Sequence, residues 1–189
     1  MMNERDYERC VEKGVFAENL FLEYMLDNGY EFIAGDINRK TINPDYFEEC
    51  FSCRYIPPTN KRGSRLAFTD SNGKEFIFIM PDYLLNYKNN GERYLFDVKS
   101  RKSDNPKESK HKLIEYYGVS LHTGLPCFIS LVVWSERFEG YNIYIDNVDK
   151  YVTIDELIRF EQGERFSEYV YFDLKNMWKF NKKAIKVQF

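Results

Sequence analysis

The sequence predicts an α/β domain in which helices flank a central mixed sheet. Residues 4–28 repeat apolar side chains at helical spacing, and Gly29 ends that pattern. Residues 65–98 contain several short apolar runs separated by turn signals, which is typical of consecutive strands. A helical pattern near 107–122 then leads into the continuously apolar run 128–134. That order is expected where a helix connects two neighbouring parallel strands.

Length and composition fit one domain with its own core. The chain has 189 residues, without an internal repeat or a low-complexity segment, so we expect a single domain over 1–189. No apolar run is long enough to cross a membrane, and the charged start lacks a signal region, so we expect a cytoplasmic protein. Four cysteines without a secretory signal are expected to be reduced thiols. Cys50-x-x-Cys53 could be half of a zinc site, but no second cysteine or histidine pair completes it.

Charge is distributed unevenly along the chain. The net charge is −3, yet residues 99–112 carry six lysines and arginines against two acidic residues. The stretch 175–186 adds five lysines, with Trp178 and Phe180 among them. Such segments can contact phosphates in an acidic protein, and the alternative is a solvated loop and tail. We expect the two aromatic residues to close a core, with stacking on bases as the alternative.

The stretch 76–102 gathers two carboxylates and a lysine on a predicted β-hairpin. Asp82 precedes one strand, Asp97 lies near the end of the next, and an asparagine–glycine pair marks the turn between them. A four-residue loop places Asp82 opposite Asp97, whereas a two-residue turn makes them diagonal neighbours. Because strand side chains alternate between faces, Asp97 and Lys99 point the same way.

Two carboxylates this close repel each other unless a cation lies between them. A divalent metal bound by oxygen ligands is the economical explanation for their convergence. The alternative interpretation contains no metal: Asp82 opens a turn after Pro81, while Asp97 and Lys99 form a cross-strand ion pair at a sheet edge.

Pro81-Asp82, a spacer of fourteen residues and Asp97-Val98-Lys99 resemble the PD-(D/E)xK nuclease signature. That superfamily includes restriction endonucleases, archaeal-type Holliday junction resolvases and many phage nucleases. The resemblance implies a restriction-endonuclease-like fold with an αβββαβ core. It also implies a phosphodiester hydrolase that depends on a divalent metal.

The resemblance also implies a role for each motif residue. Asp82 and Asp97 are expected to ligate Mg²⁺, with Mn²⁺ able to substitute, and the Val98 carbonyl is expected to add an oxygen ligand. Lys99 is expected to orient or deprotonate the attacking water and to stabilise developing charge. The all-oxygen ligand set, without a nearby histidine, favours magnesium over zinc.

The predicted first helix is similar to the opening helix of resolvase-like nucleases, in which a glutamate reaches the metal site. Glu18 fits that position best, because it follows the small Ala17 and has apolar neighbours. Glu23 is the weaker candidate. The alternative makes Glu18 an ordinary acidic residue on a helix surface.

Four basic residues are candidates for nucleic-acid contact. Arg101 and Lys102 follow the motif, and Lys110 and Lys112 begin the predicted helix near 107–122. In relatives, a polar residue near the start of that helix often helps bind the scissile phosphate.

Two segments lie outside the predicted core. Residues 34–64 contain several turn signals and are expected to form a loop-rich insertion, whose Arg54, Lys61 and Arg62, together with Arg65 just beyond it, are further candidates for backbone contact. Residues 135–189 are expected to extend the core at its C-terminal side, with a helix signalled by the capping box Thr153-x-x-Glu156.

These observations lead to one functional hypothesis with stated alternatives. The chain is expected to be a single-domain, Mg²⁺-dependent DNA endonuclease, of a phage or mobile-element type, acting in the host cytoplasm. The alternatives are an RNA nuclease or exonuclease with the same site, and an inactive nucleic-acid-binding protein. A junction resolvase would be a homodimer, because cutting two strands requires two sites. No glycine-rich nucleotide motif is present, so we expect no nucleotide cofactor.

Overall fold

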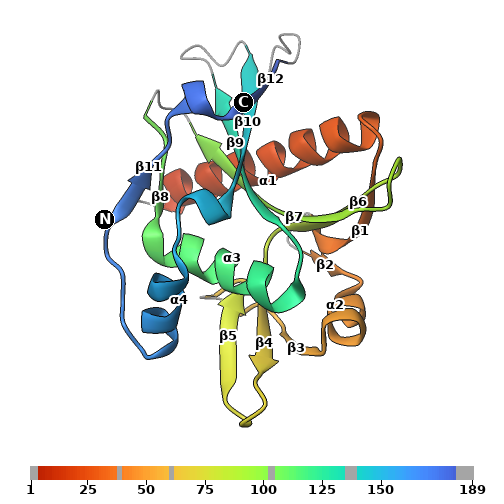
Figure 1. Cartoon of the computed structure of the whole chain (residues 1–189). Helices are drawn as coiled ribbons and strands as arrows, with labels where there is room; N and C mark the ends of the chain where they lie inside the picture. The colour runs from red at the N-terminus through yellow and green to blue at the C-terminus, as the bar shows by residue number, and fades with distance from the viewer. Residues whose placement is uncertain (1–3, 38–39, 60–61, 102–104, 135–139, 182–189) are drawn as a thin grey trace.

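The computed structural model describes residues 4–37, 40–59, 62–101, 105–134 and 140–181. Its central feature is a seven-stranded sheet with helices on both faces (Figure 1). In order across the sheet, the strands are β12 (Trp178–Asn181), β10 (Tyr141–Asn147), β9 (Cys127–Trp134), β7 (Arg93–Arg101), β6 (Tyr83–Tyr87), β1 (Tyr30–Ile37) and β2 (Lys40–Ile42). β7 and β9 pair in parallel, and the other described neighbours pair antiparallel. The predicted mixed sheet is therefore confirmed.

Helices α1 (Glu4–Asp27) and α3 (Lys110–Thr123) cover opposite faces of this sheet. Phe21 of α1 packs against Phe96, with ring centroids 5.3 Å apart, whereas Leu95 belongs to the core on the α3 side. Neighbouring residues of β7 thus alternate between the two cores, as the strand period requires. The elements α1, β1, β6, β7, α3 and β9 reproduce the αβββαβ order of the restriction-endonuclease-like core.

A second, three-stranded sheet is inserted between β1 and β6. It consists of β3 (Cys53–Ile56), β4 (Arg65–Thr69) and β5 (Glu75–Ile79). The consecutive strands expected over 65–98 are present, but they do not pair in sequence as one sheet, because β5 does not pair with β6 in the described sheets. Pro81 lacks an amide N–H for pairing, and the chain leaves β5 through a bond from the Met80 amide to the Ser64 carbonyl, 2.9 Å.

The predicted loop-rich segment 34–64 contains more regular structure than its turn signals indicate. β1 continues to Ile37, β2 follows, and α2 spans Pro44–Phe51. Asn43-Pro44 looked like a turn, but a proline in the first helical turn is compatible with a helix, since its missing N–H has no helical partner there.

The register of the β6–β7 hairpin is the one with a four-residue loop. Tyr83 pairs with Phe96, and the Tyr87 amide donates to the Glu92 carbonyl at 2.8 Å. Gly91 supports this turn with a φ of +72°, in the left-handed region that glycine tolerates. Of the two registers left open by the sequence, this one places Asp82 opposite Asp97.

The C-terminal part of the chain packs beside α3 and extends the main sheet. Its further elements are β8 (Lys107–Ser109), which pairs with β11 (Tyr169–Tyr171), the helix α4 (Ile154–Glu161), and the short 3₁₀ helices η1 (Val148–Lys150) and η2 (Leu174–Asn176). The capping box of Thr153 and Glu156 is present at the start of α4. The core role expected for Trp178 is wrong, because this side chain on the edge strand β12 is 62% exposed. Among the described residues, no helix has the length and apolar character needed to cross a bilayer.

Candidate active site

The hairpin brings Asp82 and Asp97 to one side of the main sheet. One step beyond the Tyr83–Phe96 pair, the register places the two aspartates opposite each other. Both line a cavity of about 400 Å³ on the α3 side, together with Lys99. The fold therefore gathers the three motif side chains that the sequence suggests, in one solvent-accessible space.

Backbone contacts hold Asp82 in place. Its Oδ2 accepts a hydrogen bond from the Val98 amide at 2.7 Å, and its carbonyl accepts one from the Asp36 amide, also at 2.7 Å. Burial, and then the charge of Asp97, raise the pKa of Asp82 well above its ordinary value, although Lys99 and the Val98 amide lower it. The ionised pair is thus costly unless more positive charge arrives.

Asp97 is 1% exposed and pairs with Lys99. The ammonium Nζ donates to Oδ1 at 2.8 Å and lies 2.6 Å from Oδ2. Oδ2 is buried and accepts no well-formed hydrogen bond from the described residues. Burial lowers the pKa of Lys99, but the charges of Asp97 and Asp82 outweigh it and hold the pKa above its ordinary value. Lys99 is therefore a fixed cation in this arrangement.

Tyr116 of α3 also lines this cavity. Its side chain is 2% exposed, and its ring centre lies 5.7 Å from the Lys99 ammonium. Burial and the charges of Asp97 and Asp82 raise the pKa of the phenol well above its ordinary value. The helical periodicity marked Tyr116 as a buried residue but gave no sign of its place in the site.

The two glutamate candidates on α1 reach different places. The charge of Glu18 contributes to the raised pKa of Asp82 and of Tyr83, after burial in both cases, so Glu18 is within electrostatic reach of the aspartates. It is half-buried and does not line the cavity. Glu23 instead acts on Tyr141 of β10, whose pKa it raises after burial. The position of Glu18 agrees better with the opening-helix role.

Asp36 is a third carboxylate at this cavity that the sequence analysis missed. It accepts hydrogen bonds from Thr41 Oγ1 at 2.5 Å and from Ser64 Oγ at 3.3 Å, and burial raises its pKa. A bulge at Ile33 shifts the β1 register just before it, as bulges near functional sites often do. Gly35-Asp36 directly after an apolar strand start was the available signal.

Within the described part of the chain, no three acidic, histidine or cysteine side chains gather closely enough to enclose a metal ion by themselves. Two carboxylates nevertheless suit Mg²⁺, which usually keeps several waters and binds through one or two carboxylates plus substrate phosphate. Asp82 and Asp97 are opposite each other in the hairpin and line the same cavity, so their carboxylates can bind one ion together. The residues present therefore fit the expected cation.

Besides Lys99, three basic side chains in the described part of the chain line the cavity. Arg62 comes from the loop before β4, Arg65 is the first residue of β4, and Lys112 comes from the first turn of α3. The Arg65 Nε is buried and has no hydrogen-bond partner among the described residues. Burial raises the pKa of the Glu115 carboxyl on α3 to about 7, although the charge of Arg65 lowers it. The same cavity thus contains the aspartates and positive groups that an anionic ester could contact.

The other predicted nucleic-acid contacts are engaged elsewhere or lie outside the described residues. Arg101 Nη2 pairs with Glu108 at 2.8 Å, and Lys110 Nζ pairs with Glu156 at 2.8 Å. Neither lysine 110 nor Arg101 lines the cavity. Lys102 and Lys61 lie outside the described residues. Of the insertion arginines, Arg54 pairs with Glu75 on the exposed side of the small sheet.

Cys50 and Cys53 lie in different surroundings. Cys53 Sγ donates to the Phe47 carbonyl at 3.2 Å, and burial raises the pKa of its thiol to about 11. Cys50 is exposed, and both are free thiols. Among the described residues, no third histidine, cysteine or acidic side chain gathers with them into a group that could hold a metal ion.

Comparison with known proteins gives little beyond this geometry. No family model matches the chain, and no curated protein matches it. Among solved structures it is similar to Hjc, a Holliday junction resolvase of Archaeoglobus fulgidus. The two are 14% identical, and the match covers 68% of this chain and 85% of that chain at a TM-score of 0.34. With so low a score, the function has to be argued from this chain's own topology and side chains.

Proposed function

We propose that the chain is a divalent-metal-dependent nuclease that hydrolyses phosphodiester bonds in DNA, most simply as an endonuclease. One observation carries the proposal: Asp82 and Asp97, from neighbouring strands, line one cavity together with Lys99 and three further basic side chains of the described residues. The fold predicted from the same motif is present independently of that cavity, in the order of helices and strands.

Each residue of the cavity has a chemical task in this proposal. Asp82 and Asp97 would hold Mg²⁺ or Mn²⁺, with the Val98 carbonyl and Glu18 as further candidate ligands. When bound, such an ion polarises the phosphoryl group and lowers the pKa of a coordinated water. Lys99, held as a cation by Asp97 at 2.8 Å, is suited to orient the attacking water and to stabilise charge on the phosphoryl oxygens.

The basic side chains that line the cavity, Arg62, Arg65 and Lys112, would bind the substrate backbone. Arg65 presents an Nε without a hydrogen-bond partner in the described structure, and a guanidinium can bind a phosphate through two parallel hydrogen bonds. Lys112 is 45% exposed, and its ammonium lies 3.8 Å from Glu108, too far for a hydrogen bond, so it can turn toward an incoming phosphate.

A nuclease panel tests the proposal. The purified chain is incubated with supercoiled, linear and branched DNA and with single-stranded RNA, with Mg²⁺, with Mn²⁺ or with chelator. We expect metal-dependent cleavage of DNA that falls at least about 100-fold in Asp97→Ala and in Lys99→Ala, as for other losses of transition-state stabilisation. Glu75→Ala is the matched control, because this acidic residue sits in an exposed pair away from the cavity.

The outcomes separate the remaining alternatives. Cleavage of RNA alone, or release of single nucleotides from ends, would replace the DNA endonuclease by the corresponding enzyme with the same site. Cleavage that persists in chelator or in Asp97→Ala would contradict the proposal. Efficient cutting of branched DNA would require two sites, and light scattering should then show a dimer.

A further inference from the structure

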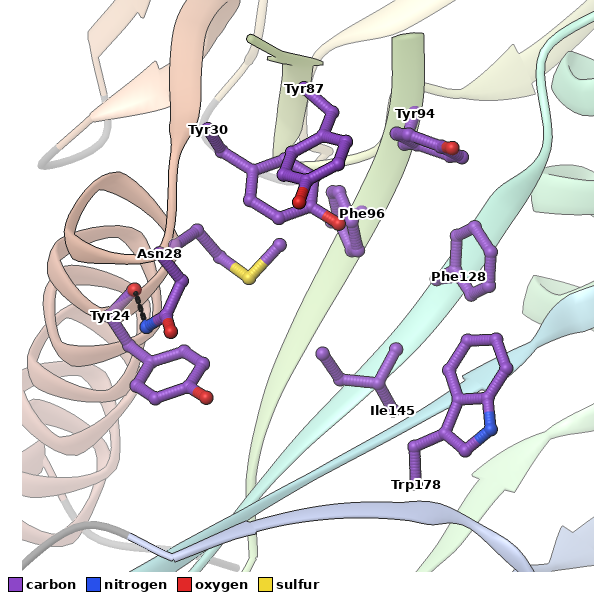
Figure 2. A pocket seen from close by; sticks show the side chains of 10 residues that line it. Tyr24, Asn28, Tyr30, Tyr87, Tyr94, Phe96, Phe128, Ile145 and Trp178 are labelled. Carbon is purple, nitrogen blue, oxygen red and sulfur yellow. Dashed lines mark hydrogen bonds between the residues drawn. The ribbon is translucent and has the colours of Figure 1, made fainter. Parts of the chain in front are cut away.

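A second cavity lies on the other face of the main sheet, at the end of α1 (Figure 2). Its volume is about 350 Å³, within the range of small-molecule sites. Seven of its ten lining residues are aromatic, and Phe96 places it on the α1 side, since Phe96 and Asp97 point to opposite faces of β7. The nuclease proposal does not use this cavity.

The aromatic rings come from separate elements and surround an open space. In Figure 2, Tyr24 lies on one side of the opening and Trp178 and Phe128 lie on the other, with Tyr30 and Tyr87 above them. The Tyr30 and Tyr87 ring centroids are 4.9 Å apart, and those of Phe128 and Trp178 are 6.0 Å apart. Trp178 is 62% exposed at the rim. Such a large exposed ring beside a cavity is more usual at a binding site than on an ordinary surface.

The lining residues that the structure describes include no lysine or arginine. The basic residues next to two of the lining rings turn to the opposite face. Arg93, which precedes Tyr94, lies 5.6 Å from the ring centre of Tyr46, and Lys179, which follows Trp178, lies 5.8 Å from that of Tyr144. An anionic ligand would therefore find no counter-charge among the described residues that line this cavity.

Negative charge is present instead. Glu92 accepts a hydrogen bond from the Tyr94 hydroxyl, which is the main reason that the pKa of Tyr94 is raised to about 12. The pKa of Tyr30 is also raised, by burial first and then by neighbours that include Glu92. The C-terminus of α1, where a helix carries partial negative charge, ends at this cavity, and its last turn contains no basic residue.

We propose that this cavity binds an alkylammonium group, such as a quaternary or methylated amine. Ring faces attract such a cation through their quadrupoles, with Trp the strongest, and Glu92 with the α1 carbonyl end supplies long-range attraction. Alkyl groups on the nitrogen lower the cost of removing it from water, which suits an apolar lining. The group can belong to a small molecule or to a modified lysine of a peptide.

Isothermal calorimetry with the full chain tests this assignment. The probes are choline, a short peptide with one trimethyllysine, the same peptide unmethylated, and 3,3-dimethylbutan-1-ol, which has the shape of choline without its charge. We expect choline or the methylated peptide to bind about 2- to 30-fold more tightly than its uncharged or unmethylated counterpart, the range of cation–π energies. The tighter of the two probes identifies the source of the group.

Two variants tie the binding to the cavity. Trp178→Leu and Glu92→Gln both change exposed positions, so the fold should survive. Each variant is expected to bind the charged probe about 2- to 30-fold more weakly than the wild type. Tyr169→Leu is the control, since this exposed aromatic of β11 does not line the cavity. No preference for choline over its neutral counterpart together with none for the methylated peptide over the unmethylated one, no binding of either charged probe, or binding unchanged in both variants would overturn the assignment. Asp97→Ala should bind like the wild type, because the two cavities are on different faces.

Discussion

Gly35→Ala provides a sharp test of how the site is built. A Cβ at Gly35 would lie 2.1 Å from the Asp82 carbonyl oxygen and 2.9 Å from the Tyr83 Cα. Ordinary contact begins at 3.4 Å, so the Asp82 carbonyl would have to withdraw by about 1.3 Å. Both obstructing atoms are backbone, and the Asp36 amide bond to that carbonyl would stretch with the movement. The substitution therefore displaces the Asp82 backbone relative to Asp97 without changing either carboxylate.

The expected result is a large loss of cleavage rate in a variant that is less stable but still folds. A misplacement of about 1 Å can lower a reaction rate by about 100-fold. The backbone at Gly35, with a φ of +142°, adds about 1–3 kcal/mol of destabilisation for any other residue. The assays are the single-turnover cleavage rate, the Mn²⁺ affinity by calorimetry, and urea unfolding.

Gly73→Ala is the matched control. Gly73 also has a positive φ, +80°, but a Cβ there meets nothing within 4 Å, and the residue lies in the β4–β5 turn. It is expected to lose stability and keep its cleavage rate and its metal affinity. A folded Gly35→Ala variant that cleaves within about threefold of the wild type, with unchanged Mn²⁺ affinity, would refute the placement of Asp82 described above.

Three further predictions follow from other parts of the structure. Arg65→Ala should weaken DNA binding and reduce the slope of log K against log salt by about 0.9, the value for one phosphate contact, whereas Arg54→Ala should leave the slope unchanged; anisotropy titrations in Ca²⁺ measure both. Because burial raises the pKa of Glu115 to about 7, its contribution to stability is present below its ordinary pKa and is lost as the pH rises through 7. Glu115→Gln, which stays neutral, should therefore gain on the wild type by up to ~3 kcal/mol between about pH 5 and about pH 8 in urea unfolding, and a constant difference would contradict the raised pKa. Thr153→Ala should cost about 1 kcal/mol through loss of the α4 capping box, and an unchanged unfolding midpoint would argue against that cap.

The part of the site that could be predicted from the sequence is encoded locally. Asp82, Asp97 and Lys99 belong to two strands joined by a tight turn, so their relation depends only on strand alternation and loop length. The four-residue loop was one of two registers that the sequence left open, and the Tyr87–Glu92 bond selects it.

The remaining walls depend on contacts between distant segments. Arg65 lies on β4, whose alternating pattern identifies a strand but not its partner, so the separate sheet with β3 and β5 could not be foreseen. Asp36 reaches the cavity because β1, rather than β5, pairs with β6. Trp178 was read as a core residue because aromatic side chains usually are, and only its place on the edge strand β12 exposes it.

The place of β7 in the sheet has a consequence for its acidic residue. Strand β7 lies between β6 and β9 in the sheet. It pairs with β6 from Arg93 to Phe96 and with β9 from Leu95 to Arg101, so β9 holds the backbone at Asp97. Amide hydrogens in such a central strand exchange last with solvent, through opening of the whole domain. Asp97 and the Val98 amide that holds Asp82 therefore keep their spacing although the two carboxylates repel. A cation that enters between them meets oxygens already in position, so little conformational entropy is lost when it binds.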